Sequence, residues 1–412
     1  MENNGYKKNF LWNSIGSSIN AFNSLFFLII ITRINGIDTA GVFTFAFSMA
    51  TLFNIIGVYS GRVYQVTDVD NNTYKDYFIN KIITCILMII VYTVFILVNG
   101  YNFQKTIILF TLCSLKMIEA MSEYFYAYFQ QKNELYKVGI SLTIKNVLML
   151  VVFFIINCLT KNIILSTISL IISYCLIMII YDFRYFDFSL LKERLNKNNL
   201  KSIFVKGFFT FCLTFLSFLL INLPRYIVDM KMTDTYNAIF GILIMPATAT
   251  LLLAQFFIQP SIVYLKEKLA KNDSKGFKRI IIDIFKVMIV LAVFILLGTH
   301  FLGIKILNLI YGIDLIEYKF SLLIIMCGSV FYALVVIISN ILITMRITFW
   351  QVILYIVALI ISYFSSIYFI DNNGIFGSAL AYLITMTSIF IMFIILLITS
   401  IKKLIGVKYE QY

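Results

Sequence analysis

The sequence Asn222-Leu-Pro-Arg-Tyr-Ile-Val-Asp229 closes an apolar run that begins near Ile203. A run of this length can cross a bilayer, because a spanning helix needs about 20 mostly apolar residues. Pro224 lacks a backbone donor and crowds the preceding turn, so we expect the helix to bend or end there. Arg225 follows directly, and its charge either extends to the headgroups or points into a water-filled cavity towards an anion.

Apolar runs of similar length recur along the whole chain. The chain has 412 residues, of which 61% are hydrophobic and 13% charged, and its mean hydropathy is +0.93. This composition excludes a soluble protein and predicts an all-α polytopic membrane protein. We expect twelve transmembrane helices at 10–32, 40–61, 79–98, 106–129, 138–158, 162–181, 203–224, 236–258, 281–301, 320–343, 350–370 and 375–400.

The distribution of basic residues predicts the orientation of the chain. Lys7 and Lys8 precede the first expected helix, and most of the 33 Lys and Arg residues lie in segments on the same side as these two. The positive-inside rule therefore places the N-terminus in the cytoplasm, and an even number of helices returns the C-terminus there. The same rule accounts for the net charge of +13, so we expect no nucleic-acid partner.

The reactive side chains predict neither an enzyme nor a metal site. All six cysteines lie inside apolar runs, His300 is the only histidine, and no CxxC pair occurs. These features argue against zinc, haem and a disulfide framework. No pair of nucleophile and base stands out, and no phosphate-binding Gly-rich loop occurs, so we expect no cofactor and no catalytic residue. The first apolar run is too long for a cleaved signal peptide.

The polar segments divide the chain into two halves. We predict a six-helix lobe at 1–185, a cytoplasmic linker at 186–202 and a second six-helix lobe at 203–412. The octets that end in Arg33 and Arg225 are similar, and each places an arginine at the outer end of the first helix of its half. Such parallel repeats occur in transporters that bind substrate near the bilayer midplane and alternate access by rocking.

The first expected helix carries two rows of small and amide side chains. Because a helix has 3.6 residues per turn, the members of each row share one face. Either row fits close packing against another helix or a hydrophilic cavity wall for a sugar-bearing ligand, and the spacing alone leaves both open. The rows are Asn13, Ser17, Asn20 and Ser24, and Gly16, Asn20 and Asn23.

The fourth expected helix is the richest in charge. Lys116, Glu119 and Glu123 share one face, and an unpaired charge at this depth costs about 3 kcal/mol or more. We expect them to pair with one another and to leave one carboxylate spare. A structural ion pair, an anion contact by the lysine and a proton or sodium relay through the glutamates all fit. Lys145 is expected to extend to the headgroups.

Two further arginines mark cytoplasmic helix ends. Arg62 follows the second expected helix, and Arg346 lies between the tenth and eleventh. Each position is typical of a positive-inside anchor.

Several stretches together resemble the polysaccharide flippase family. They are Asn222-Leu-Pro-Arg-Tyr226, Pro246 with Gln255 and Pro260, Arg346 with Thr348, and Gly374-Ile-Phe-Gly-Ser-Ala379, within two six-helix halves. These flippases are the O-antigen and capsule repeat-unit translocases of the multidrug/oligosaccharidyl-lipid/polysaccharide exporter superfamily. The resemblance covers the whole chain.

The resemblance implies a MATE-like fold with two lobes around a cationic central cavity. It implies a bacterial cytoplasmic membrane protein that flips an undecaprenyl-pyrophosphate-linked oligosaccharide, with membrane lipid, a coupling ion (H⁺ or Na⁺) and the polymerase of the pathway as further partners. It favours the cavity reading of Arg225, since a pyrophosphate prefers arginine and lysine. The implied substrate contacts are Arg225, Arg33, Lys116, Asn222, Tyr226, Asn20, Arg62 and Arg346, and the implied ion-coupling residues are Glu119 and Glu123.

Two other functions remain as alternatives. A multidrug or cation antiporter of the same superfamily typically carries a coupling carboxylate in its first helix, and residues 10–32 contain no Asp or Glu. The peptidoglycan-precursor flippase, a close relative, has fourteen helices, whereas we expect twelve. A membrane polysaccharide polymerase usually needs a large outer loop, and the longest one expected here is about residues 302–319.

Overall fold

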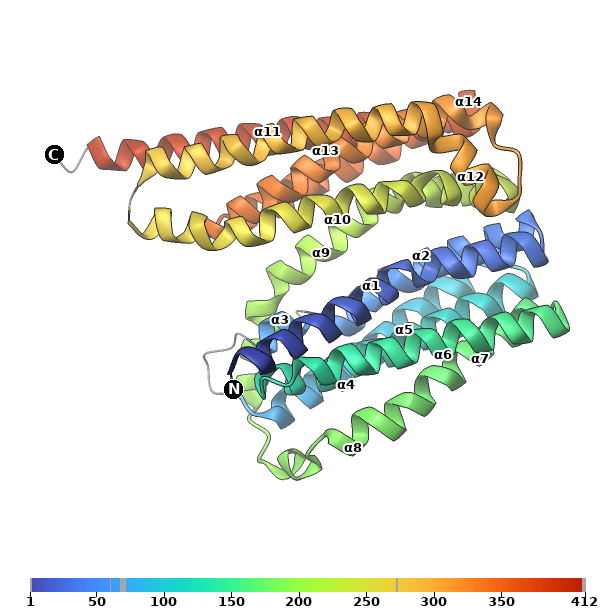
Figure 1. The fold of residues 1–412 in the computed structure, drawn as a ribbon, viewed down its shortest axis with the longest axis horizontal. Coiled ribbons are helices and arrows are strands. Elements are labelled where there is room, and N and C mark those ends of the chain that lie inside the picture. The colour runs from blue at the N-terminus through green and yellow to red at the C-terminus, as the bar shows by residue number, and fades with distance from the viewer. Residues whose placement is uncertain (1, 60, 67–71, 272, 410–412) are drawn as a thin grey trace. The chain divides into compact units, whose positions relative to one another are not determined.

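The helices of this protein form two units that are joined within one long helix. The computed structural model describes residues 2–59, 61–66, 72–271 and 273–409, and within these ranges it contains helices and no strand. The first unit ends at Phe215 and the second begins at Leu216. Both residues lie in α9, which therefore contributes to each unit (Figure 1). The predicted lobe boundaries at 185 and 203 stay predictions.

The first unit contains seven long or medium helices and several short ones. They are α1 (Glu2–Ile34), α2 (Ile37–Val58), α3 (Gly61–Val66), α4 (Tyr74–Asn99), α5 (Phe103–Gln131), α6 (Leu135–Thr160), α7 (Ile163–Ile177), the π-helix η1 (Met178–Asp182), α8 (Phe183–Tyr185), the 3₁₀ helix η2 (Phe188–Lys192) and the first part of α9 (Lys197–Lys231).

The second unit continues from α9 through five further helices. They are α10 (Asp234–Ala270), α11 (Ser274–Gly298), α12 (Ile304–Tyr311), α13 (Lys319–Thr344) and α14 (Phe349–Tyr409), with the π-helix η3 (Thr299–Gly303) before α12 and the 3₁₀ helix η4 (Ile316–Tyr318) before α13.

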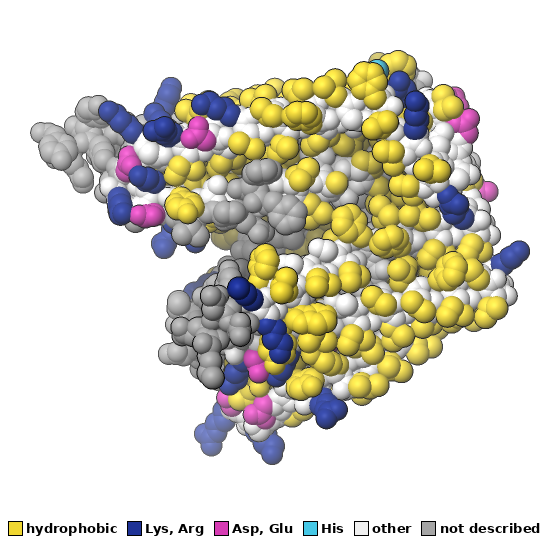
Figure 2. All heavy atoms as spheres, in the orientation of Figure 1, with side chains coloured by type: hydrophobic (Ala, Val, Ile, Leu, Met, Phe, Trp, Pro, Cys, Tyr) yellow, Lys and Arg dark blue, Asp and Glu magenta, His cyan; other side chains and the backbone are white. Residues whose placement is uncertain are grey.

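The lengths and apolar surfaces of these helices make the protein a multi-pass membrane protein. Among the described residues, ten helices are long and apolar enough to cross a membrane. Helix α5 has 29 residues but is not one of the ten, since it carries four charged side chains. Figure 2 shows hydrophobic side chains along the sides of the helices of each unit, whereas many lysines and arginines lie near helix ends. Such a surface suits a lipid environment.

Local capping interactions explain several helix ends. At the start of α4, the Thr73 side chain accepts from the Asp76 amide and the Asp76 carboxylate accepts from the Thr73 amide, which makes a capping box. The side chains of Asn102 and Asn162 accept from first-turn amides of α5 and α7 in the same way. Gly100 ends α4 in the left-handed conformation that glycine adopts without strain.

Two predicted helix ends do not occur in the structure. Helix α9 continues past Pro224 to Lys231, and α10 continues past the predicted end at residue 258 to Ala270. Membrane helices tolerate proline because neighbouring groups can satisfy the backbone carbonyl that it leaves without a donor. The helix boundaries predicted at 224 and 258 are therefore wrong.

Helix α14 consists of two helices that meet at Gly374, where φ is 57° and ψ is −130°. A β-carbon at Gly377 would lie 1.9 Å from the carbonyl oxygen of Phe369, so the chain passes very close to itself after the reversal (Figure 1). Only glycine fits both positions without strain. The glycines of the 374–379 stretch therefore build the connection between two helices.

Helices α1 and α6 approach each other through two glycines. A β-carbon at Gly139 would lie 2.2 Å from the backbone carbonyl of Trp12, and one at Gly16 would lie 2.5 Å from the carbonyl oxygen of Gly139. Seven residues further along each helix, the Asn23 side chain donates to the Asn146 side chain over 2.7 Å. Small residues and amide hydrogen bonds are the usual means of close helix association in a membrane. Gly16 and Asn23 thus belong to a packing surface, whereas Asn20 of the same row is exposed.

We expect Gly139→Ala to destabilise the first unit. The added methyl group overlaps the backbone of α1, which cannot move aside as a flexible side chain would, so the helices must separate. Overpacking of this kind costs about 1–3 kcal/mol. The measurement is the midpoint temperature of thermal unfolding of the purified protein in detergent, monitored by fluorescence-detected size exclusion.

The matched control for this variant is Gly298→Ala. Gly298 is also helical, and no atom lies within 4 Å of the position of an added β-carbon. Alanine favours the helix over glycine by about 0.8–1 kcal/mol, so this variant should keep or raise the midpoint. Equal midpoints for the two variants would contradict the tight α1–α6 contact.

Candidate functional site

Helix α5 lies at the centre of the first unit and packs against α2, α4, α6 and α7. It carries polar groups on two faces. One face presents Lys116, Glu119 and Glu123, which are partly exposed. The other presents Ser122 and Tyr126, which are buried. The α5 side chains therefore form one accessible and one enclosed polar cluster.

The accessible face begins with an ion pair within α5. Lys116 Nζ lies 2.7 Å from Glu119 Oε2, and the same ammonium group lies 4.7 Å from the centre of the Phe47 ring. The side chains of the lysine and the glutamate are 14% and 21% exposed. The predicted pairing within this helix is confirmed for these two residues. The charges remain near enough to the surface to meet a ligand.

Glu123 faces an arginine, whereas one of the two glutamates was expected to stay spare. Arg62 Nε, on α3, lies 3.9 Å from Glu123 Oε2. Both side chains are partly exposed, at 25% and 33%. Arg62 therefore does more than anchor a helix end, because it joins α3 to the charged face of α5.

Lys81, on α4, lies in the same part of the first unit as Glu123. It is buried, and its ammonium group donates to the carbonyl oxygens of Gly57 and Val58 over 3.1 and 2.8 Å. These carbonyls end α2, where the helix itself supplies no donors and the helix dipole favours a cation. The lysine thus stabilises the end of α2 next to the charges of α5.

A small cavity lies among these groups. Its volume is about 10 Å³, which is near the space that one water molecule requires. Its lining includes Arg62, Gln65, Asn80, Lys81 and Glu123. The Gln65 Nε2 and Asn80 Nδ2 donors are buried without a hydrogen-bond partner among the described residues. The cavity is therefore rich in donors around a single carboxylate.

The enclosed face of α5 surrounds a buried ion pair. Lys145 of α6 and Asp182 of η1 are in contact, and both side chains are 0% exposed. Lys145 also donates to Ser122 Oγ over 3.1 Å and to the Tyr126 hydroxyl over 2.9 Å. Asp182 accepts from Ser141 Oγ over 2.6 Å. A buried pair is stable only when its remaining donors and acceptors are also satisfied, as they are here.

The structure corrects the expected position of Lys145, which does not extend to the headgroups. Its ammonium group lies 4.3 Å from the centre of the Tyr174 ring on α7. The predicted helix at 162–181 ends just before Asp182, so the sequence analysis did not identify this ion pair. Two features of the sequence could have indicated the pair. Lys145 is a single lysine about two turns into one apolar helix, and Asp182 is a single aspartate at the end of the next.

In the second unit, Arg225 is the principal buried cation. It lies on α9 directly after Pro224, and its side chain is 6% exposed. Its Nε is buried without a hydrogen-bond partner, and no carboxylate pairs with it among the described residues. A turn earlier, Asn222 Nδ2 donates to the carbonyl oxygen of Phe218 over 3.0 Å. Tyr226 is half-buried.

The remaining predicted site residues lie at exposed positions. Arg33 lies in the last turn of α1, and Asn20 lies on the exposed side of that helix. Arg346 is exposed in the turn between α13 and α14, with φ at 61°. The side chain of Pro260 lies outside the part that the structure describes.

The described residues hold no cluster that fits a metal ion. No group of three or more His, Cys, Asp or Glu side chains converges within them. The described polar groups of the site are paired and buried charges, which are rare and often functional inside a membrane.

The chain has the fold of MATE-like membrane transporters. Two solved structures share it over nearly the whole chain. An inward-facing MATE-family multidrug resistance transporter of the MOP superfamily matches with a TM-score of 0.76 at 10% identity, over 97% of this chain and 99% of that one. The lipid II flippase MurJ, in an inward closed conformation, matches with a TM-score of 0.66 at 17% identity, over 96% and 90% of the two chains.

A curated relative adds a biological context. The capsular polysaccharide biosynthesis protein CapF of Staphylococcus aureus is 25% identical over 339 residues, which cover 79% of this chain and 82% of that protein. No family model matches the sequence. These findings confirm the resemblance to the exporter superfamily that the sequence motifs indicated.

Proposed function

We propose that this protein flips an undecaprenyl-pyrophosphate-linked oligosaccharide repeat unit from the cytoplasmic to the outer leaflet, for O-antigen or capsule biosynthesis. The similarity to a capsular polysaccharide biosynthesis protein and to a lipid II flippase supports this substrate class. The protein is not an enzyme in this proposal, and it works by alternating access.

The observation that carries the proposal is the buried Arg225. A guanidinium group without a carboxylate partner is costly in a low-dielectric environment, whereas an anion that reaches it forms strong, bidentate hydrogen bonds. A pyrophosphate supplies such an anion, and arginine matches its geometry better than lysine does. Hydroxyl and amide groups, including Asn222 and Tyr226 beside the arginine, suit the sugar.

The topology proposed for the membrane has twelve spans. It counts α5 as a span in spite of its charges and the two helices of α14 separately, in addition to the other helices of spanning length. With both termini in the cytoplasm, the lobes comprise 1–185 and 203–412. The membrane is the cytoplasmic membrane of a bacterium.

The other charged residues have proposed roles in the same cycle. Arg33, Lys116, Arg62 and Arg346 attract the pyrophosphate or guide it, and Asn20 contacts the sugar. Glu119 and Glu123 couple the cycle to H⁺ or Na⁺, since each lies beside a cation that protonation of the glutamate would release. The undecaprenyl chain stays among the membrane lipids.

An ion-coupled multidrug antiporter is the second candidate. The carboxylates on α5 and the match to a multidrug transporter favour it. The absence of Asp and Glu from residues 10–32 favours the flippase. A polysaccharide polymerase fits less well, because such a protein usually needs a large outer loop, whereas the segment at 302–319 is short and largely helical.

A deletion strain tests the proposed function directly. We expect single undecaprenyl-linked repeat units to accumulate on the cytoplasmic leaflet and surface polymer to disappear, because the units cannot cross. The measurement is extraction of the lipid-linked oligosaccharides with a leaflet-specific label on the sugar. Glu119→Gln and Glu123→Gln variants in the complemented strain test the proposed coupling in the same assay.

The other outcomes of this experiment separate the alternatives. Intact surface polymer without accumulated units would contradict the flippase and lead to a dye-efflux assay for the antiporter. Single units on the outer leaflet, with polymer lost, would point to the polymerase. Restoration by the wild-type gene is the control in each case.

A further inference from the structure

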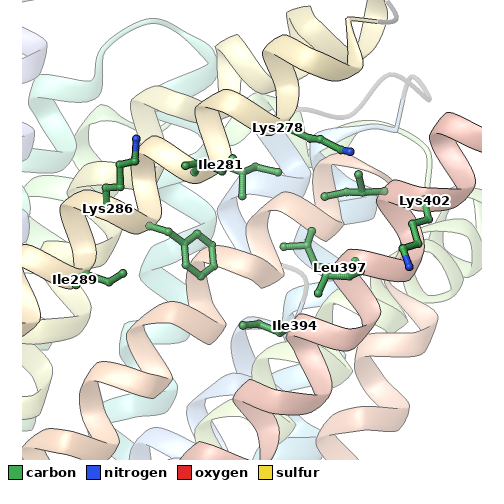
Figure 3. A pocket seen from close by; sticks show the side chains of 11 residues that line it. Lys278, Ile281, Lys286, Ile289, Ile394, Leu397 and Lys402 are labelled. Atoms are coloured by element: carbon green, nitrogen blue, oxygen red, sulfur yellow. The ribbon is translucent and has the colours of Figure 1, made fainter.

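An apolar groove runs along the side of the second unit, between α11 and the second helix of α14. Its volume is about 510 Å³ (Figure 3). Ile281 and Leu397 are buried in the groove, at 7% and 5% exposure, whereas Ile282, Ile289 and Ile398 are about half exposed. Apart from three lysines, only Ile, Leu and Phe side chains line it. The groove therefore has no hydroxyl or amide side chain that could recognise a sugar.

Two lysines without partners lie at one end of this groove. Lys278 is in the second turn of α11, and Lys402 is near the end of α14, so the two come from opposite sides of the groove (Figure 3). Neither forms an ion pair with a described residue. The third lysine, Lys286, lies 3.6 Å from Asp283 Oδ1 and is thereby neutralised. The mouth of the groove consequently carries about two positive charges.

The length of the groove matches one leaflet of a bilayer. Lys278 and Ile289 are eleven residues apart on α11, and at 1.5 Å per residue this corresponds to about 16 Å. The hydrocarbon core of a bilayer is about 30 Å thick, so one leaflet contributes about 15 Å. When the lysines lie at the headgroups, the apolar wall therefore reaches to the middle of the membrane.

We propose that this groove is a binding site for an anionic phospholipid. One acyl chain lies along Phe285 and Ile289, and the phosphate lies between Lys278 and Lys402. The proposed topology puts these lysines at the cytoplasmic surface, so the lipid belongs to that leaflet. A phospholipid fits the groove better than the transported lipid does, because a polyprenyl chain is several times longer than the groove and its sugar finds no polar partner there.

The test is lipid binding to the purified full-length protein by native mass spectrometry. Phosphatidylglycerol should remain bound where phosphatidylcholine with the same chains dissociates. Each lysine near an anionic lipid contributes about 1 kcal/mol, so Lys278→Gln with Lys402→Gln should weaken the affinity for phosphatidylglycerol about 30-fold. This readout does not depend on export, so it can fail or succeed independently of the flippase assignment.

Two further variants separate the groove from general surface charge. Lys266→Gln with Lys275→Gln removes the same charge from exposed positions outside the groove and should leave the affinity nearly unchanged. Ile398→Trp fills the half-exposed groove without changing charge and should lower the affinity. Equal losses in both lysine pairs would overturn the proposal. Displacement of phosphatidylglycerol by equimolar undecaprenyl phosphate would also overturn it and assign the groove to the substrate.

Discussion

An Arg225→Ala variant is expected to reach the membrane at the wild-type level and to lose export of repeat units by about 30-fold or more. Loss of one partner of a buried, charge-assisted contact costs about 2–5 kcal/mol, and each 1.4 kcal/mol is a factor of ten. The protein itself should tolerate the change, because no carboxylate among the described residues pairs with the arginine and would be stranded by the substitution. The measurement is surface polymer per unit of membrane protein in the complemented deletion strain.

Two controls make this result specific to the guanidinium group. Arg225→Lys keeps the charge but loses the planar pair of donors, so it should retain an intermediate level of export. Lys231→Ala removes a cation from the same helix, where its pair with Asp371 is 3.0 Å long and both side chains are over 40% exposed. It should export normally. Full export by the Arg225→Ala, Arg33→Ala double variant would exclude the proposed pyrophosphate site.

The second large effect is expected for Lys145→Met, which should destabilise the first unit by about 3–5 kcal/mol. The substitution leaves the Asp182 carboxylate buried without its cation, and removal of one partner of a buried ion pair has a cost of this size. Within the described part of the chain, Ser141 would remain as its side-chain donor. The measurement is the denaturation midpoint of the purified protein, with the amount of folded protein in the membrane as a second readout.

A charge-neutral double variant distinguishes the pair from simple loss of packing. Lys145→Met with Asp182→Leu removes both charges and should recover most of the lost stability, since apolar residues of similar volume often replace a buried pair without loss. Lys137→Met is the matched control on the same helix. Its pair with Glu134 is partly exposed, so the cost should stay below about 1 kcal/mol. No recovery in the double variant would contradict the electrostatic explanation.

The membrane class and the pairing of Lys116 with Glu119 were predictable from the sequence. Hydropathy marks spanning helices, and an i, i+3 spacing places two side chains on one face whatever the surrounding fold. Both signals depend only on neighbouring residues in the sequence, so they can be interpreted without knowledge of the tertiary structure. The exporter-like fold was indicated by short motifs rather than by periodicity.

The partners of Glu123, Lys81 and Lys145 were not predictable in this way. Each bonds to a residue on another helix, and a single sequence contains no information on which helices become neighbours. The predictions that helices end at Pro224 and at residue 258 were wrong for a related reason. The rule that proline ends a helix comes from helices in water, whereas helices in a membrane keep their hydrogen bonds wherever neighbours permit.

The π-helix η1 has a consequence for the winding of the helix that contains it. Asp182 follows Tyr174 by eight residues, and at about 100° per residue an unbroken α-helix would place it about 80° away around the axis. A π-turn holds more residues per turn and takes up this excess, so both side chains reach the same ammonium group. Rewinding the segment to α geometry would rotate Asp182 away from Lys145. The contact with one lysine thereby fixes the rotation of this helix after Ile177.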